Sequence, residues 1–146
     1  MGTKNEAGAT TSGLSKDEVT AVQQAASEGR RTKAGKNTEQ DVLDAIEAMD
    51  PSDRAIAEGL HALVKRVAPH LVPRTWYGFP AYTKDGKVVF FWQYAGKFKT
   101  RFGHIGFQDT ARLDEGTMWP TAFAVTAWDA ANEKRVEELI LRAIAD

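Results

Sequence analysis

The sequence predicts an α+β fold in which an antiparallel β-sheet of about four to five strands packs against helices. Apolar residues recur at helical spacing over residues 15–67 and again from residue 129 to the end, whereas residues 71–125 hold short alternating runs separated by glycines. Helices and strands that are segregated along the chain in this way are typical of α+β domains. No internal repeat is visible, so we expect one domain over residues 38–146, preceded by a flexible extension over residues 1–37.

The extension is expected to contain one short helix and a basic linker. Residues 1–13 are rich in Gly, Thr, Ala and Ser, which favours disorder. Ser15 and Glu18 then have the spacing of a capping box, and Gly29 is placed to close the helix that they begin. The basic stretch that follows is interpreted as a solvated linker, with an arm that attracts polyanions as the alternative.

Three helices are expected in the domain itself. Thr38 begins the first, with Asp41 as its capping-box partner, and an apolar face recurs along it. Asp50 precedes Pro51 at the start of the second, which must end before Pro69. Asp129 is placed to cap the last helix.

The strands are read from alternation and turn residues. Asp85 and Gly86 predict a tight hairpin turn. We expect strands at residues 75–82, 87–95, 97–107 and 118–125. The first is interrupted at Gly78 and Pro80, and the third needs a bulge near Gly103 to return its later apolar residues to the core.

One candidate binding site is aromatic and basic. Residues 73–108 carry six Lys or Arg and a single acid together with many rings. We expect Lys97, Lys99 and Arg101 on one face of the third strand, Trp76 and Tyr82 in a cleft, and Phe79 in the core. Such a surface suits an anionic flat ligand or single-stranded nucleic acid, and the alternative is a sheet core with a solvated basic edge. The candidate residues are Trp76, Tyr82, Phe91, Lys97, Lys99, Arg101 and Trp119.

A second candidate site is acidic and lies on the helix after Thr38. Carboxylates three residues apart share a helix face, and oxygen ligands suit hard cations such as iron, magnesium or calcium. Metal binding there would be weak, because no cage removes the water of the ion. The alternative is a solvated acidic face near a helix amino terminus. The candidate metal ligands are Glu39, Asp41, Asp44 and Glu47.

Several kinds of chemistry have no support in the sequence. The chain has no cysteine, so thiolate nucleophiles, thiolate zinc sites and disulfides are excluded. The three histidines lack metal-ligand spacing, the serines lie in caps and tails, and no phosphate-binding glycine loop is present. We therefore predict no catalytic residues and no enzymatic activity. No signal peptide or membrane span is visible, which favours the cytoplasm and no membrane partner.

Three stretches, in this order and spacing, resemble the YdhG-like family: TWYGFPAYTKDGKVVFFWQ, KFKTRFGHIGFQD and LDEGTMWPTAFAV. The family consists of small bacterial domains of unknown function that are often labelled frataxin-like or iron chaperones. The resemblance runs from about Thr38 to Ala145, and the preceding helix and linker resemble an extension of some longer members. It implies a frataxin-like α+β fold and the binding of ferrous iron for delivery to iron–sulfur cluster or haem assembly.

Two functions follow from these observations. The first is a non-enzymatic iron-binding domain that holds Fe²⁺ on surface carboxylates and meets iron–sulfur assembly or haem-synthesis proteins through its basic sheet surface. The family has no fixed ligand motif to transfer, so the four metal candidates come from position and charge. The second is a binding module for an anionic small molecule or single-stranded nucleic acid at the aromatic and basic cleft. Nucleic acid is the less favoured partner, since the net charge is −1, and we expect a monomer.

Overall fold

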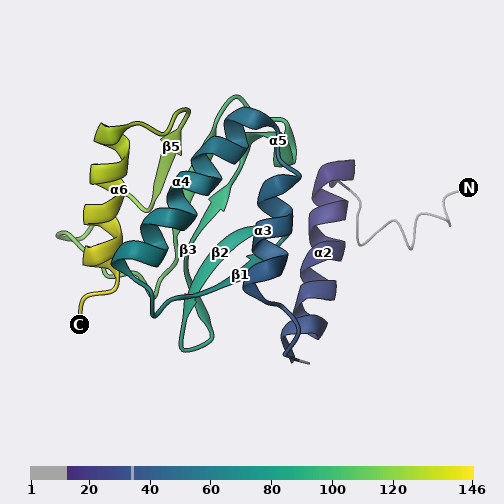
Figure 1. Ribbon diagram of the computed structural model, residues 1–146, viewed down its shortest axis with the longest axis horizontal. Helices are drawn as coiled ribbons and strands as arrows, with labels where there is room; N and C mark the ends of the chain where they lie inside the picture. Colours follow the sequence, from purple (N-terminus) through teal and green to yellow (C-terminus); the bar gives the residue numbers. More distant parts are fainter. Residues whose placement is uncertain (1–12, 34) are drawn as a thin grey trace, which may run out of the picture.

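The computed structural model describes residues 13–33 and 35–146, and the expected disorder of residues 1–12 lies outside this part (Figure 1). Its helices are α2 (Lys16–Lys33), α3 (Glu39–Glu47), α4 (Pro51–Val67), α5 (Ala95–Phe98) and α6 (Ala130–Ala143). Its strands are β1 (Val72–Trp76), β2 (Phe79–Lys84), β3 (Lys87–Gln93), β4 (Gly103–Phe107) and β5 (Ala122–Val125). The chain thus runs through helices, then a strand meander, then a helix, as the sequence predicts.

The five strands form one antiparallel sheet in the order β1-β2-β3-β4-β5. Each strand pairs with the next one along the chain, so β1 and β5 are the two edges. Asp85 and Gly86, both with positive φ (52° and 78°), make the tight β2–β3 turn that the sequence predicts. The α+β fold class is therefore confirmed.

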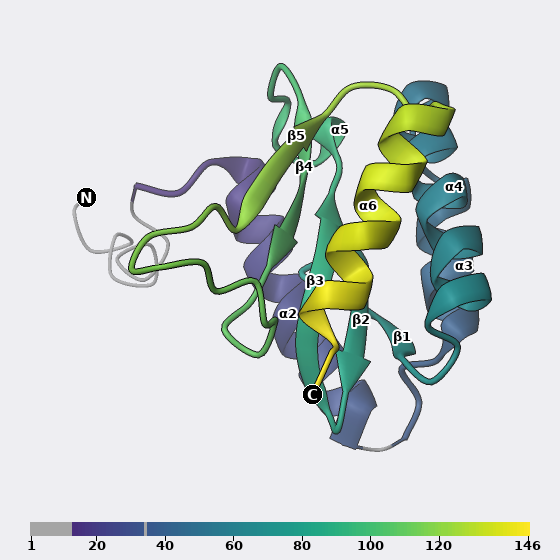
Figure 2. The same cartoon turned by 90° about the vertical axis from the view of Figure 1, so that its left-hand side faces the viewer.

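Helices α3, α4 and α6 cover one face of the sheet (Figures 1 and 2). The core between them holds Leu60 and Leu63 of α4, Ile140 of α6, and Phe90 and Trp92 of β3, all fully buried. Within the described residues, the opposite face of β3, β4 and β5 carries no such layer of helices (Figure 2). Among the described residues, no helix has the length and apolar character needed to cross a membrane.

The predicted first strand is in fact a hairpin. Tyr77 and Gly78 both have positive φ (54° and 87°) and form a two-residue turn between β1 and β2. Trp76 therefore pairs with Phe79 across the turn. The expectation that these two residues face opposite sides was wrong, because it counted alternation straight through the turn.

The predicted third strand is also shorter than expected. Residues 95–98 form the single turn α5, and Lys99 has a left-handed φ of 55°. Two backbone N–H groups of α5, on Ala95 and Gly96, are bound by the buried carboxylate of Asp53 at 3.2 and 3.0 Å. The strand begins only at Gly103, and the one register shift lies at Tyr82 and Thr83 in β2 rather than near Gly103.

Helix α2 is longer than predicted, and it packs against the domain. It continues through Gly29 to Lys33, since the φ of Gly29 is not positive and nothing closes the helix there. Its first turn does have the predicted capping box, with Ser15 N donating to Glu18 at 2.8 Å and Glu18 N donating to Ser15 at 3.1 Å. It contacts β1 and α5, so the helix of the extension is docked on the domain.

Candidate functional site

Four aromatic side chains form a cluster on the sheet face opposite α3, α4 and α6. The ring centroids of Trp76 and Phe91 lie 5.3 Å apart, those of Phe79 and Phe91 5.4 Å, and those of Trp76 and Phe79 6.0 Å. Tyr77, in the turn, places its ring 4.9 Å from Trp76. These separations are in the range of attractive aromatic contacts, and Phe79 is buried, as predicted, at 3% exposed. We call Trp76, Tyr77, Phe79 and Phe91 the aromatic cluster.

The register of the sheet explains why these rings meet. Phe91 pairs with Ala81 on one side and with Gly106 on the other, so its ring lies among small residues. A methyl group on Gly106 would collide with three ring carbons of Phe91. The absence of a side chain on Gly106 therefore leaves room for the Phe91 ring over β4.

A hollow of about 250 Å³ opens beside the aromatic cluster. Phe98 of α5 forms its far wall, which is why the turn at residues 95–98 matters for the site. The lining is almost wholly apolar, and Gln93 is its one residue that is not aromatic. We call this space the aromatic hollow; its lining residues are Trp76, Tyr77, Phe79, Phe91, Gln93 and Phe98.

Polar groups from α2 and α5 adjoin the hollow at the β1–β2 turn. Glu28, only 7% exposed, accepts a hydrogen bond from Gly78 N at 2.8 Å, and its other carboxylate oxygen has no partner among the described residues. Lys97 is also buried and donates to Gln24. Burial lowers the pKa of Lys97, while the nearby charges of Glu28 and Asp17 act to raise it. The turn is thus held by a buried, charged contact with α2.

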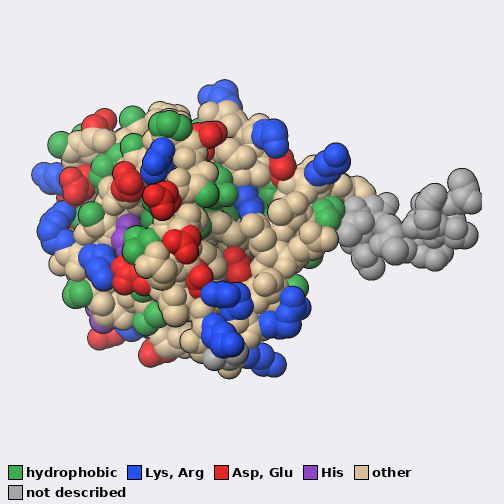
Figure 3. All heavy atoms as spheres, turned by 45° about the vertical axis from the view of Figure 1, so that its right-hand side comes forward, with side chains coloured by type: hydrophobic (Ala, Val, Ile, Leu, Met, Phe, Trp, Pro, Cys, Tyr) green, Lys and Arg blue, Asp and Glu red, His purple; other side chains and the backbone are tan. Residues whose placement is uncertain are grey.

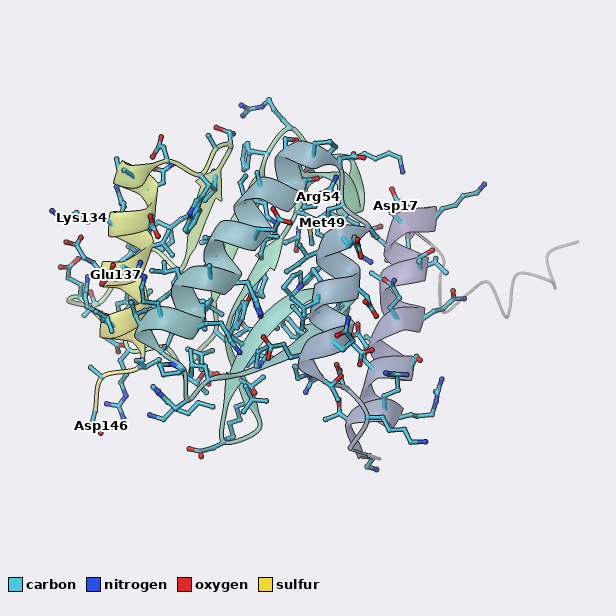
Figure 4. The ribbon with its side chains drawn as sticks, viewed as in Figure 1. Asp17, Met49, Arg54, Lys134, Glu137 and Asp146 are labelled. Atoms are coloured by element: carbon cyan, nitrogen blue, oxygen red, sulfur yellow. The ribbon has the colours of Figure 1, made fainter. Side chains whose placement is uncertain are left out.

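The other predicted basic residues lie farther out. Lys99 is exposed and binds Asp17, from the first turn of α2 (Figure 4), at 2.9 Å. The guanidinium of Arg101 lies 4.9 Å from the ring centroid of Phe102. The prediction that Lys97, Lys99 and Arg101 share a strand face was wrong. Lys97 lies within the helical turn α5, and Lys99 is itself the left-handed residue that ends this turn. They are nevertheless close along the chain to Phe98 of the hollow.

Two predicted site residues lie apart from the hollow. Tyr82 is fully buried on the face covered by helices, so the expectation that it lines the cleft was wrong. Trp119 packs against the same core from the segment before β5. Tyr82 lies on the opposite sheet face from Trp76, because the turn at residues 77–78 changes which residues of β1 and β2 share a face.

Tyr82 instead belongs to a polar chain inside the helix layer. Its hydroxyl lies 3.0 Å from Nδ1 of His61, and Nε2 of His61 lies 2.7 Å from Glu39. Lys65 also donates to Glu39, at 3.1 Å. Hydrogen bonds from His61 and then Lys65 lower the pKa of Glu39, against the effect of burial. Burial and the charge of Glu39 raise the pKa of Tyr82. Because Tyr82 is inaccessible, this chain ties α3 and α4 to the sheet.

The four predicted metal ligands do not converge. Glu39 is bound by His61 and Lys65, Asp41 by Arg31 at 2.8 Å, and Asp44 by Gln40 at 2.9 Å. Burial alone would raise the pKa of Asp41, but hydrogen bonds from Arg31 and Thr38, with the charge of Arg31, lower it. In the described part of the chain, no group of three or more His, Asp or Glu is arranged to hold a metal ion. Acidic side chains on this side of the molecule are scattered among other residues (Figure 3).

Sequence reasoning missed part of the hollow. Tyr77, Phe79, Gln93 and Phe98 line it, and Glu28 braces its turn. A signal for the first two was present, since strand-forming residues flank a Tyr-Gly pair that fits a two-residue hairpin. Glu28 carries no local signal, because its partner Gly78 lies fifty residues farther along the chain.

Comparisons with known proteins give no match: no family model, no curated protein and no solved structure that was compared matches the chain. The resemblance to the YdhG-like family therefore stays a prediction from the quoted sequence stretches.

Proposed function

We propose that the protein is a binding module for a small, planar, anionic molecule whose ring enters the aromatic hollow. The observation that supports this most is the hollow itself, with Trp76, Phe79 and Phe91 on a sheet face that the main helix layer leaves free. Ligand sites are concave, largely apolar and oriented by a few polar groups. Here we expect the side chain of Gln93 to orient the ligand, and Tyr77 extends the aromatic surface.

The charges around the hollow favour an anion. Arg74 lies two residues before Trp76 on the same strand face, and Lys97, Lys99 and Arg101 follow the hollow in the chain. Asp17 and Glu28 offset two of these four cations. Within the described residues, Arg74 and Arg101 form no ion pair with a carboxylate. We therefore expect Arg74 and Arg101, which lie near hollow residues in the chain, to attract an anionic group on the ligand.

The size of the hollow favours a small molecule over nucleic acid. A volume of about 250 Å³ is just below the usual range of ligand pockets and suits one ring system. Binding of single strands without sequence preference uses a basic groove that follows the backbone and several rings that stack on successive bases. Here the rings pack mainly on one another, which leaves one position for a ligand ring.

A thermal-shift screen tests this proposal. Benzoate, salicylate and indole acetate are compared with their neutral amides and with a short oligothymidylate. We expect the carboxylates to raise the melting temperature and the amides to act less. Trp76→Leu should abolish the shift, whereas Trp119→Leu, a matched change of a half-buried tryptophan elsewhere, should keep it. No shift with any carboxylate, or an equal loss in both variants, would contradict the proposal.

Iron binding on α3, with delivery to iron–sulfur or haem assembly proteins in the cytoplasm, stays the prediction that the resemblance implies. The candidates Asp44 and Glu47 are exposed and accessible to an ion. Glu39 and Asp41 would have to exchange their bonds to Lys65 and Arg31 for metal ligation. For this reason the aromatic hollow, rather than α3, carries our proposal.

A further inference from the structure

The strand β5 has an open edge. It pairs only with β4, and Phe107 N donates to Thr121 O at 2.7 Å just before the strand. Bonded and non-bonded pairs alternate in an antiparallel ladder. Ala122 and Ala124 therefore direct their backbone N–H and C=O groups away from β4. Both residues are exposed, and their side chains are single methyl groups.

A groove of about 340 Å³ runs between this edge and helix α6. One wall is the whole of β5, since all four of its residues line the groove. The other wall is a mixed helix surface of Asn132, Arg135, Val136 and Leu139. A strand of four residues spans roughly 13 Å, enough for a short extended segment to pair along its length.

The groove holds one unpaired cation. Arg135 lies with its guanidinium 5.7 Å from the ring centroid of Phe123, at the side of the groove. It forms no ion pair with any carboxylate in the described residues. Its neighbours Lys134 and Glu137 project from α6 away from the sheet (Figure 4). Arg135 is thus the charge on α6 that faces a segment lying in the groove.

We propose that β5 and α6 form a docking site for an extended, acidic peptide segment of a partner protein. The segment adds to the sheet next to β5 and pairs with the free groups of Ala122 and Ala124. Side chains on one face of the added strand point toward α6, where an acidic residue meets Arg135 and an apolar residue meets Leu139. Within its four residues β5 holds no lysine, proline or bulge that would prevent pairing, and Pro120 lies two residues before the strand begins.

Fluorescence polarisation with labelled peptides tests this proposal on the full chain. The probes are a short peptide of alternating valine and glutamate and its counterpart of valine and lysine. A third probe, the glutamate peptide with N-methylated amides, cannot pair as a strand. We expect the glutamate peptide to bind about tenfold more tightly than either of the other two.

Two variants distinguish the contribution of strand pairing along β5 from that of the charge of Arg135. Arg135→Glu changes an exposed side chain and should reverse the preference, so that the lysine peptide binds best. Ala124→Pro should abolish binding of both peptides, and circular dichroism checks its fold. Equal binding of both peptides to wild type and Arg135→Glu would overturn the proposal. A dimer of the wild-type chain in analytical ultracentrifugation that Ala124→Pro abolishes would also overturn the proposal, because a second copy of the chain would then fill the groove. The aromatic hollow is on another surface, so neither outcome affects the proposed function.

Discussion

Trp76 and Phe79 lie opposite each other across the two-residue turn between β1 and β2, with ring centroids 6.0 Å apart and planes at 87°. This relationship builds the aromatic hollow, because it puts both rings on the face where Phe91 also lies. The turn depends on Tyr77 and Gly78 in left-handed conformations and on the carboxylate of Glu28, which binds Gly78 N. The site therefore joins the sheet and helix α2 in one unit.

The first prediction concerns the packing beneath the hollow. Gly106→Ala should destabilise the fold by about 1–3 kcal/mol, since the new methyl group collides with the Phe91 ring. Urea unfolding measures the change. The ring of Phe91 should also move, so binding of any hollow ligand should weaken. A variant as stable as wild type would show that Phe91 does not lie over Gly106.

Gly29→Ala is a matched glycine-to-alanine change that should alter the free energy of unfolding in the opposite direction. It lies inside α2, has no positive φ, and has open space where a Cβ would stand. Gly29→Ala should therefore stabilise the protein by about 0.5–1 kcal/mol, because alanine favours the helix interior. If Gly29 instead closed the helix in a left-handed conformation, the same change would destabilise, and urea unfolding distinguishes the two.

The second prediction concerns the two buried charges of Glu28 and Lys97, of which Glu28 acts to raise the pKa of Lys97. Lys97→Met should destabilise by about 1–3 kcal/mol, because the buried Glu28 carboxylate loses its nearby cation. Glu28→Gln in the same chain should recover part of this loss. The exposed pair Lys99 and Asp17 serves as the control cycle, with an expected coupling of about 0.2–1 kcal/mol. Equal coupling in both cycles would contradict a buried role for Glu28.

The third prediction is a pH dependence at Glu39. Its pKa in the folded protein is below the ordinary value of 4.5, first because His61 and then because Lys65 bind it. Between the folded pKa and 4.5, Glu39 therefore stays charged in the folded state, whereas it takes up a proton in the unfolded state. The stabilisation is present above 4.5 and is lost as the pH falls through the folded pKa.

Urea midpoints measured from about pH 7 down to pH 3 check this behaviour. Glu39→Gln should flatten the acid side of the stability profile. Asp44→Asn, which removes an exposed carboxylate of the same helix, should leave the profile nearly as it is. Profiles of the same shape for Glu39→Gln and wild type would refute the role of the His61 and Lys65 contacts.

The fourth prediction concerns iron. If the acidic surface of α3 binds Fe²⁺, anaerobic calorimetric titration should show weak binding that the Asp41→Ala, Asp44→Ala and Glu47→Ala triple variant loses. The binding should be weak because no group of described residues forms a cage. Identical heats in wild type and the triple variant would reject iron binding on α3. Arg112→Ala with Asp114→Asn gives a distant control.

Local signals were enough to predict much of this fold. The capping box of Ser15 and Glu18, the start of α4 at Pro51 and the turn at Asp85 and Gly86 depend only on neighbouring residues, and the structure contains all three. Helical spacing likewise identified α3, α4 and α6. These features decide the fold class, which is why that prediction was confirmed.

The site was harder to predict because it depends on distant contacts. Tyr77 takes a left-handed φ, which is uncommon for a bulky residue, so the turn was read as part of a strand. The run from Lys97 to Arg101 alternates like a strand, yet Asp53 of α4 binds the backbone of α5 and fixes a helical turn there. The contact of Asp53 leaves no signal in the local pattern, and together with the turn at Tyr77 it decides which rings and charges meet.

The most direct test of the account is a titration with salicylate followed by proton–nitrogen correlation spectra of the tryptophan indoles. The chain has four tryptophans, and only Trp76 lines the hollow. Trp92 is fully buried in the core, so its indole signal is an internal control. We predict a saturable shift of the Trp76 signal, assigned with Trp76→Phe, while the signals of Trp92, Trp119 and Trp128 stay in place. An unmoved Trp76 signal, or an equal shift of all four, would contradict the proposed site.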